Sequence, residues 1–172
     1  MTFQILKGNV LDARADALLL TIDGARRGME GNIARSFARR WPDAFEQIEK
    51  GIRYPVPLGR TVAAHPDTEC PFRTVLVAST LHHLDFLPDT QKSSIISTAL
   101  SEAVNLAVRN RCRTLATAVM MGGWRLPFDA ALRAMLSTLN EHASGASSPS
   151  VSIHVLTEHD WGTAKAIAAA IR

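Results

Sequence analysis

Two glycine-containing segments of the sequence carry residues that could bind a phosphate group. Residues 23–32 read Asp-Gly-Ala-Arg-Arg-Gly-Met-Glu-Gly-Asn, and residues 120–127 read Met-Met-Gly-Gly-Trp-Arg-Leu-Pro. Glycine lets the main chain approach a ligand closely, and the free amides at the start of a helix attract anions. Neither segment is a GxGxxG or P-loop motif, so glycines that only end a strand are the alternative interpretation.

Side chains in these two segments could add to the binding. Arg26 and Arg27 could donate hydrogen bonds to a diphosphate. Trp124 could stack on a ribose or a base, and a tryptophan that shields the core is the alternative. We expect the ligand to contact the segments at Asp23, Arg26, Arg27, Gly28, Met29, Gly31, Met121, Gly122, Gly123 and Trp124.

The histidines and cysteines do not form a metal-binding pattern. No two of the six histidines have the i, i+4 spacing of a helical zinc motif. Cys70 and Cys112 are far apart and belong to no C-x-x-C pair. We therefore expect neither a metal nor a cofactor. His82 and His83 follow a predicted strand near the expected site, and a ligand contact there is a further hypothesis.

The elements that must position these residues follow from the apolar pattern, which predicts strands at residues 3–6, 17–22, 60–64, 74–79, 114–121 and 151–156. A helix ending before Pro42 and a longer one over residues 90–109 are also predicted. Asp43, Asp129 and Asp160 are expected to cap three further helices. The third and fourth strands are expected to be neighbours.

The alternation of strands and helices favours an α/β fold with three α/β/α layers. Its centre would be a mixed, mostly parallel sheet of about six strands. The length of 172 residues and the absence of a linker predict a single domain over residues 1–172. In such sheets, ligands bind beyond the carboxyl ends of the strands. The site is therefore expected at residues 8–10, 22–31, 79–89 and 120–127.

The composition excludes several classes of protein. Hydrophobic residues make up 47% of the chain and charged residues 20%, as in an ordinary globular protein. The formal net charge is +3 without a run of Lys or Arg, so we do not expect nucleic acid as a partner. The first residues read as a strand rather than a signal peptide, and no apolar run reaches the roughly 18 residues of a membrane span. A cytoplasmic protein without a membrane partner is expected.

The order of these motifs resembles that of the macro domains, a family that binds ADP-ribose. In that family the first strand ends in Gly-Asp-Ile, the second reads Asp-Ala-Ile-Val-Asn-Ala-Ala-Asn, and a glycine-rich loop runs into Gly-Val-Asp-Gly-Ala-Ile. The corresponding segments here are Gly-Asn-Val at 8–10, Asp-Ala-Leu-Leu-Leu-Thr-Ile-Asp at 16–23 and Gly-Met-Glu-Gly-Asn-Ile at 28–33. Residues 57–59 are similar to the family's Pro-x-Gly, and residues 120–127 to its Ser-Thr-Gly-Val-Tyr-Gly-Phe-Pro loop. The resemblance spans nearly the whole chain.

The resemblance also implies roles for single residues. Asn9, with Val10 beside it, takes the place of the family's adenine-contacting Asp and offers an amide in place of a charge. Leu20 and Asp23 take the places of two Asn residues, the first of which orients the distal ribose in hydrolytic members. Glu30 matches an acidic residue that assists the attack of water in some of those members, so it is the candidate catalytic residue. Stabilising the amino end of the following helix is the alternative role of Glu30.

The function that the resemblance implies is binding of ADP-ribose or a related ADP-ribose-containing nucleotide, as a reader or sensor. The ligand would be a small nucleotide or the group carried by an ADP-ribosylated protein. An ADP-ribosyl hydrolase that removes ADP-ribose from a protein or metabolite is the alternative, and Leu20 argues against it because it offers no polar group to the ribose. A further alternative is an interaction or nucleic-acid-binding domain whose pocket is closed by Arg26, Met29 and Trp124.

Overall fold

The computed structural model describes residues 2–123, 125–142 and 148–171. Within these residues, the strands are β1 (Phe3–Lys7), β2 (Ala17–Asp23), β3 (Thr61–Ala64), β4 (Thr74–Leu81), β5 (Thr114–Ala118) and β6 (Ser150–Val155). The α-helices are α1 (Asn32–Arg40), α2 (Pro42–Gly51), α3 (Asp89–Arg109), α4 (Phe128–Glu141) and α5 (Glu158–Ile171). A short 3₁₀-helix, η1 (Val10–Asp12), follows β1. The order of strands and helices agrees with the prediction.

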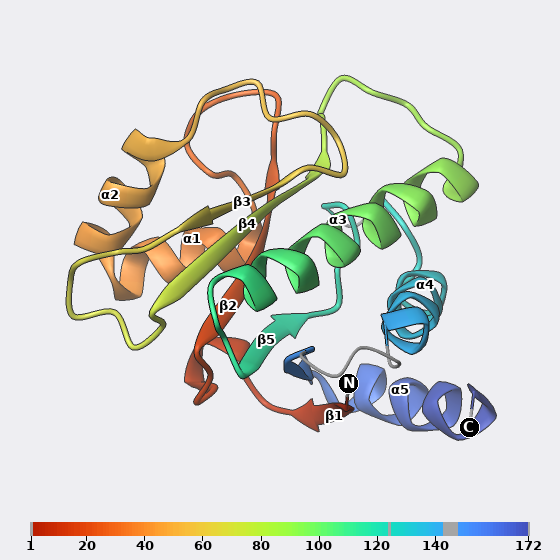
Figure 1. Ribbon diagram of the computed structural model, residues 1–172. Helices are drawn as coiled ribbons and strands as arrows, with labels where there is room; N and C mark the ends of the chain where they lie inside the picture. The colour runs from red at the N-terminus through yellow and green to blue at the C-terminus, as the bar shows by residue number, and fades with distance from the viewer. Residues whose placement is uncertain (1, 124, 143–147, 172) are drawn as a thin grey trace.

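The strands form one sheet in the order β1-β6-β5-β2-β4-β3 (Figure 1). All neighbouring strands are parallel except β3, which runs antiparallel to β4. The predicted mixed, mostly parallel sheet and the predicted pairing of the third and fourth strands are therefore confirmed. Because β1, β6, β5, β2 and β4 all point the same way, their carboxyl ends meet at one edge.

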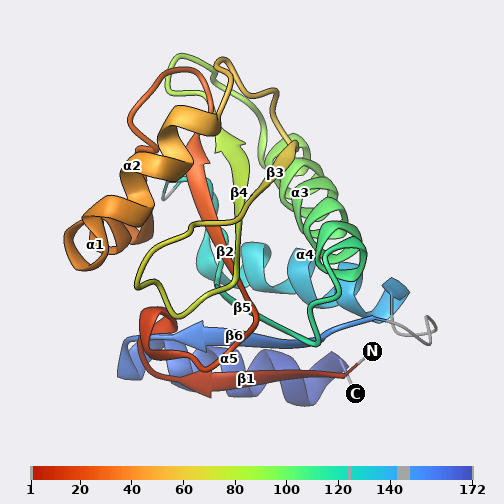
Figure 2. The same ribbon diagram turned by 60° about the vertical axis from the view of Figure 1, so that its left-hand side comes forward.

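Helices cover both faces of the sheet, and this confirms the three-layer architecture. Helices α1 and α2 lie on one face, and α3, α4 and α5 lie on the other (Figure 2). Alternate residues of β2 serve the two faces: Leu18 and Leu20 belong to the cluster under α1 and α2, whereas Leu19 belongs to the cluster under α3 and α4. This explains why β2 reads as a continuous apolar run.

Helix α3 is the longest helix and lies across the sheet with one apolar stripe inward. Its buried residues are Ile96, Ala99, Leu100, Ala103, Val104 and Ala107. Their i, i+3, i+4 spacing places them on one face, as predicted. Among the described residues, no helix combines the length and the apolar character that crossing a bilayer requires.

Three predicted helix caps and one predicted strand end are wrong. Asp43 and Asp129 lie inside the first turns of α2 and α4, because each helix begins at or just after a proline. At α5 the cap is Thr157, whose Oγ1 accepts the backbone N–H of Asp160 at 3.1 Å. Strand β5 ends at Ala118 rather than at residue 121, because the chain then turns towards α4.

Candidate functional site

A cavity of about 500 Å³ opens at the carboxyl edge of the sheet. Its lining comes from the carboxyl ends of β6, β5, β2 and β4, from the loops after these strands and after β1, and from residues of α1, α4 and α5. Neighbouring strands lie about 4.8 Å apart, so the edge that these strands form is roughly 19 Å long. Pockets that hold small molecules have volumes of about 300–1,000 Å³. The cavity can therefore hold an elongated small molecule.

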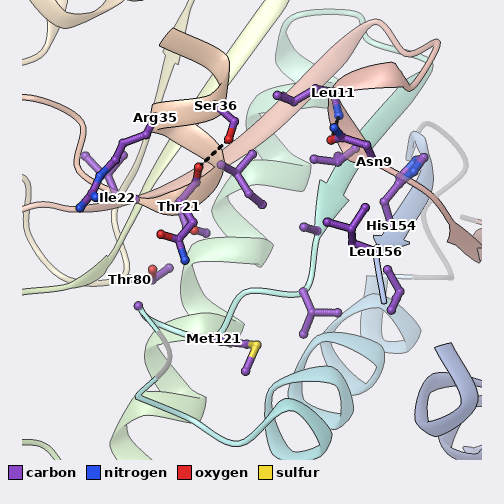
Figure 3. A pocket seen from close by; sticks show the side chains of 18 of the residues that line it. Asn9, Leu11, Thr21, Ile22, Arg35, Ser36, Thr80, Met121, His154 and Leu156 are labelled. Carbon is purple, nitrogen blue, oxygen red and sulfur yellow. Dashed lines mark hydrogen bonds between the residues drawn. The ribbon is translucent and has the colours of Figure 1, made fainter. Parts of the chain in front are cut away.

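One end of the cavity lies beyond β1 and β6. Asn9, His154 and Leu156 line this end together (Figure 3). The Oδ1 atom of Asn9 accepts the N–H of Leu11 at 3.0 Å and so caps η1. Burial lowers the pKa of His154, although the nearby charge of Asp12 acts in the opposite direction. This end offers a side-chain amide and a neutral imidazole beside apolar side chains.

The start of α1 forms the cavity wall beside β2. Gly31, Asn32 and Ile33 line the cavity. The first bond within the helix runs from the N–H of Arg35 to the carbonyl of Gly31 at 2.8 Å, so the preceding amides have no acceptor inside the helix. The first turn contains no acidic residue, and Gly31 has no side chain to cap it. Such a turn attracts anions.

Gly31 allows the close contact between α1 and β2. A Cβ atom at this position would lie 2.4 Å from the carbonyl oxygen of Thr21. No larger residue could keep the helix start at this distance from the strand. The glycine therefore places the free amides of α1 at the cavity.

Arg35 and Ser36 are cavity-lining residues that sequence analysis missed. Figure 3 shows them on the side of Thr21 and Ile22, opposite Asn9. Arg35 is exposed, and it takes part in none of the salt bridges within the described residues. Its position one turn after Gly31 was the available signal, because residues four apart share a helix face.

Of the contacts predicted from the sequence, those that line the cavity are Asn9, Val10, Asp23, Gly31, Met121 and Gly123. The predicted contacts outside its lining are Arg26, Arg27, Gly28, Met29 and Gly122. The N–H of Gly28 donates to Oε1 of Glu49 at 2.9 Å, which draws this part of the loop towards α2. The side chain of Met29 is fully buried in the cluster under α1 and α2. The loop therefore presents its far end, and not its arginines, to the cavity.

Glu30 lines the cavity immediately before α1. Its Oε2 atom lies 2.8 Å from Nη2 of Arg26, and both side chains are partly exposed. Its carbonyl accepts the N–H of Asp23 at 2.8 Å and closes the loop. The position suits both predicted roles of Glu30, but the ion pair already compensates the carboxylate charge.

A contact between Asp23 and His83 joins two cavity-lining residues that are 60 positions apart in the chain. The Oδ2 atom of Asp23 lies 2.8 Å from Nδ1 of His83. The ladder between β2 and β4 is irregular here: Ile22 pairs with Ser79, and Asp23 pairs with Leu81. The sequence suggested a ligand contact at His83 but gave no sign of this pairing.

The loop after β5 forms the cavity wall next to α4. Met121 and Gly123 line the cavity, whereas Gly122 faces a much smaller hollow under α3. Gly122 and Gly123 have φ angles of 54° and 65°, in the left-handed region that favours glycine. The predicted stacking residue Trp124 lies outside the described residues.

Arg125 joins this loop to residues 82–88. Its guanidinium donates to the carbonyl oxygens of Asp85 and His83, both at 2.8 Å. The same group lies 5.8 Å from the ring centre of Phe86. A forked guanidinium can satisfy two carbonyls at once, so Arg125 fixes the loop that carries His83.

Hydrogen bonds also tie together the other loops beside the cavity. The N–H of Gly24 donates to the carbonyl of Leu81 at 2.9 Å, and the N–H of Val56 donates to the carbonyl of Gly24 at 2.8 Å. Nε2 of His82 lies 2.8 Å from the carbonyl oxygen of Val56. The loops after β2, α2 and β4 thus form one bonded wall, and His82 faces this wall and is not among the cavity-lining residues.

Within residues 2–123, 125–142 and 148–171, no three His, Cys, Asp or Glu side chains are grouped so that they could hold a metal ion. The titratable side chains at the cavity are Asp23, Glu30, Arg35, His83, His154 and Asp160. The charge that the cavity can present to a ligand therefore depends on these groups.

Comparison of the sequence with protein-family models and with curated proteins finds no match. Comparison with solved structures finds macrodomains. The chain is similar to the Trypanosoma brucei macrodomain in complex with ADP, with a TM-score of 0.80 and 14% identity over 97% of this chain and 69% of the other. A mutant of the Oceanobacillus iheyensis macrodomain with ADPR gives a TM-score of 0.77 and 13% identity, over 98% and 92% of the two chains.

The macrodomain of Thermus aquaticus DarG is also similar, with a TM-score of 0.67 and 20% identity over 90% of this chain and 98% of the other. At these identities the likeness establishes the fold. The predicted resemblance to a divergent macro domain is thus confirmed at the level of structure.

Proposed function

We propose that this chain, which has the macrodomain fold, binds ADP-ribose or a related ADP-ribose-containing nucleotide as a reader or sensor. The observation that carries the proposal is the cavity along five carboxyl strand ends, with the uncapped start of α1 in its wall. An extended dinucleotide-like ligand has two ends and an anionic centre. The cavity offers different groups at its two ends and free amides between them.

The ligand's adenine would lie at the end beyond β1 and β6. The amide nitrogen of Asn9 can donate to a ring nitrogen of the base, and its oxygen keeps a second lone pair for an exocyclic amine. The neutral ring of His154 and the apolar side chain of Leu156 lie at the same end, and both suit an uncharged nucleobase. The adenine role that the resemblance gives to Asn9 is thus compatible with its position.

The diphosphate would lie against the start of α1. The residues at the uncapped start of α1 line this part of the cavity, and the exposed side chain of Arg35 can add a fixed positive charge. Arg35 then takes the role that the sequence had suggested for Arg26 and Arg27. The T. brucei macrodomain is described with ADP and the O. iheyensis macrodomain mutant with ADPR. Both have this fold, and this supports a ligand that contains a diphosphate.

Hydrolysis with Glu30 as the general base is the second candidate function, and the contacts around Glu30 favour it less. Arg26 already pairs with the Glu30 carboxylate. Leu20, which stands where the resemblance has a ribose-orienting Asn, is fully buried in the cluster under α1 and α2. It cannot offer a polar group to a ribose. These contacts favour binding over a Glu30-dependent reaction.

Calorimetry with ADP-ribose, ADP and adenosine tests the proposal. We expect saturable binding of ADP-ribose, and at 100 times its Kd the ligand should stabilise the fold by about 2.7 kcal/mol in a thermal-shift assay. Ala118 lines the cavity and is half-buried at the end of β5. Ala118→Phe should fill part of the cavity and weaken ADP-ribose binding at least about tenfold.

Ala166→Phe, on the exposed surface of α5, is the matched control and should bind as the unchanged chain does. Circular dichroism would verify that both variants are folded. Equal affinity of folded Ala118→Phe and the unchanged chain would exclude this cavity as the site. The absence of any binding by the unchanged chain would refute the function.

A further inference from the structure

Polar side chains line the end of the cavity beyond β1 and β6. Asn9 and His154 lie there together with the apolar Leu156 (Figure 3). Asp160 lines the same cavity from the first turn of α5, the helix that follows β6. A nucleobase at this end would meet these side chains, so their hydrogen-bonding groups decide which bases are accepted.

The side chain of Asn9 is fixed in orientation and still offers both a donor and an acceptor. Its Oδ1 atom accepts the N–H of Leu11 at 3.0 Å, and its carbonyl accepts the N–H of Asp12 at 3.0 Å. Among the described residues, Nδ2 has no hydrogen-bond acceptor, and Oδ1 keeps a second lone pair. Asn9 can therefore donate to an oxygen of a base or accept from an amine of a base.

The other two polar side chains also suit more than one base. Nε2 of His154 lies 3.1 Å from Oγ of Ser152, a hydroxyl that can donate or accept, so either neutral tautomer of the ring satisfies this contact. Oδ2 of Asp160 accepts the hydroxyl of Thr157 at 2.7 Å, and Asp160 takes part in none of the salt bridges within the described residues. The Asp160 carboxylate can accept a hydrogen from an amine or from a ring N–H.

This end of the cavity is also open to water. Asn9 is exposed, and Leu156 is 69% exposed. A site rejects the wrong base mainly by leaving a buried polar group without a partner. At an exposed end, water can replace the missing partner. A change of one polar group on the edge of the base therefore carries little penalty here.

The groups assigned to the diphosphate lie away from Asn9. Arg35 lies on the side of Thr21 and Ile22, opposite Asn9 (Figure 3). The uncapped start of α1 belongs to the same wall of the cavity. Nucleotides that differ only in the base present the same diphosphate to these groups. The interactions with the charged part of the ligand are therefore independent of the base.

We propose that the cavity binds oxopurine nucleotides, in which oxygen O6 replaces the amine N6 of adenine, as tightly as it binds adenine nucleotides. The inference rests on the proposed binding of ADP-ribose and widens the ligand class of the same cavity. Adenine presents an amine N6 and a bare ring nitrogen N1, whereas hypoxanthine, the simplest oxopurine, presents O6 and an N1–H. Asn9 meets N6 through Oδ1 and O6 through Nδ2. The diphosphate and ribose then define the ligand, and the purine does not.

Calorimetry with the whole chain tests this inference on ADP-ribose and on its hypoxanthine analogue, which differ only on this edge of the base. We expect the two Kd values to agree within about threefold, because each base finds partners in Asn9, Asp160 or water. A preference for ADP-ribose larger than about threefold would overturn the inference and leave the proposed function intact. If the unchanged chain binds neither ligand, the proposed function fails and the inference fails with it.

Asn9→Asp converts the adaptable side chain into one that only accepts hydrogen bonds. Asp caps a helix start as well as Asn does, so the bond to Leu11 should persist and the fold should be unchanged. The carboxylate can still accept from N6 of adenine, but it repels O6 of hypoxanthine. We expect the Kd of the hypoxanthine analogue, divided by the Kd of ADP-ribose, to rise about fivefold or more. The added negative charge weakens both diphosphate ligands alike, and the ratio removes this effect.

Asn105→Asp makes the same chemical change at an exposed position of α3, outside the cavity lining, and is the matched control. Its ratio of Kd values should equal that of the unchanged chain. A purely structural role of Asn9 would weaken both ligands together and leave the ratio constant. A ratio that does not rise in folded Asn9→Asp would therefore overturn the role of Asn9 in accepting both bases.

Discussion

Asp16 joins two strands at the edge of the sheet opposite the cavity. Its Oδ2 atom accepts the N–H of Arg113 at 2.6 Å and the N–H of Thr114 at 3.1 Å. Its own N–H donates to Oγ1 of Thr114 at 2.8 Å. The bond from Arg113, supported by that from Thr114, holds the pKa of Asp16 below its usual range. One carboxylate thus aligns the start of β2 with the start of β5.

We predict that Asp16→Asn lowers the free energy of unfolding at pH 7 by about 1 kcal/mol. Hydrogen bonds to a charged group contribute roughly 1.5–3 kcal/mol, and solvent screening at this partly exposed site reduces that value. Because folding lowers the pKa, the stabilisation is fully present above the ordinary value of 3.8 and is lost as the pH falls through the lowered one.

Urea denaturation of both proteins across acid pH measures this effect, and the difference between them should shrink as Asp16 becomes protonated. Asp67→Asn, a change at an exposed position in the loop before β4, is the control. A difference that stayed constant down to strongly acid pH would contradict the role given to the charge.

At the scale of residues, sequence analysis located positions in the loops that follow two strands. Asn9 and Glu30 line the cavity. Both could be predicted because each lies next to a glycine in a loop that follows a strand. The contact between Asp23 and His83 could not be predicted from the sequence, because the pairing of β2 with β4 brings the two residues together. Arg26 was placed in the site on charge alone, and charge gives no direction for a side chain.

At the scale of elements, the loop from residue 82 to residue 88 is held by a partner from another loop. Arg125 donates to the carbonyls of His83 and Asp85 and lies near the ring of Phe86. Phe86 is 93% exposed and Leu84 is 76% exposed, so the loop contributes little to the core. The conformation of this loop therefore depends on the hydrogen bonds from Arg125 and not on the burial of its side chains.

We predict that Arg125→Ala loosens this loop without unfolding the sheet. Loss of two hydrogen bonds of about 1 kcal/mol each should raise amide exchange in residues 82–87 roughly tenfold or more. Hydrogen-exchange mass spectrometry measures the change. Chymotrypsin, which cuts after large apolar residues, should cleave the loop faster in the variant.

Arg125→Lys is the informative companion variant, because lysine keeps the charge but cannot satisfy two carbonyls from a rigid fork. It should exchange nearly as fast as Arg125→Ala. Exchange in residues 82–87 that matched the unchanged chain in both variants would show that the loop does not depend on Arg125.

Local sequence patterns predicted which helices and strands form better than they predicted the residues at which these elements end. The spacing in residues 90–109 gave α3 because apolar side chains on one helix face repeat every three or four residues. The end of β5 was missed because residues 119–121 are as apolar as the strand itself. Of these three residues only Met120 is buried, and it makes a different contact: its N–H donates to the sulfur of Met135 at 3.3 Å.

At the scale of the whole molecule, one sheet separates two hydrophobic clusters. Leu136 lies in the cluster under α3, α4 and α5, and Phe37 lies in the cluster under α1 and α2. Both side chains are fully buried. Strand β2 contributes to both clusters through alternate residues, so neither can be disrupted without disturbing the sheet between them.

We predict that the protein unfolds in one transition and that Leu136→Ala and Phe37→Ala each lower the midpoint temperature of that transition. Removing a buried Leu or Phe side chain costs about 2–5 kcal/mol in each case. Calorimetry should show one peak that moves to lower temperature in both variants, with no second peak. Two separate transitions, each sensitive to only one of the substitutions, would mean that the clusters unfold independently.

The sequence predicted the layers of the molecule but not the order of its strands. Alternating strands and helices require a covered, mostly parallel sheet, whatever the order. The placement of β1 next to β6 depends on the pairing of Phe3 with Val151. No local pattern records a pairing over such a distance in the chain, so the end of the cavity beyond β1 and β6 could not be foreseen as one place.

The pairing of Phe3 with Val151 also sets an order of events during synthesis on the ribosome. Strands β2 and β4 can pair once residue 81 has emerged, so Asp23 and His83 can meet early. The first strand must wait for residues 150–155 before it can pair with β6, its neighbour in the sheet. A nascent chain halted before that point would have the side of the cavity that carries Asp23 and His83 without the side beyond β1 and β6.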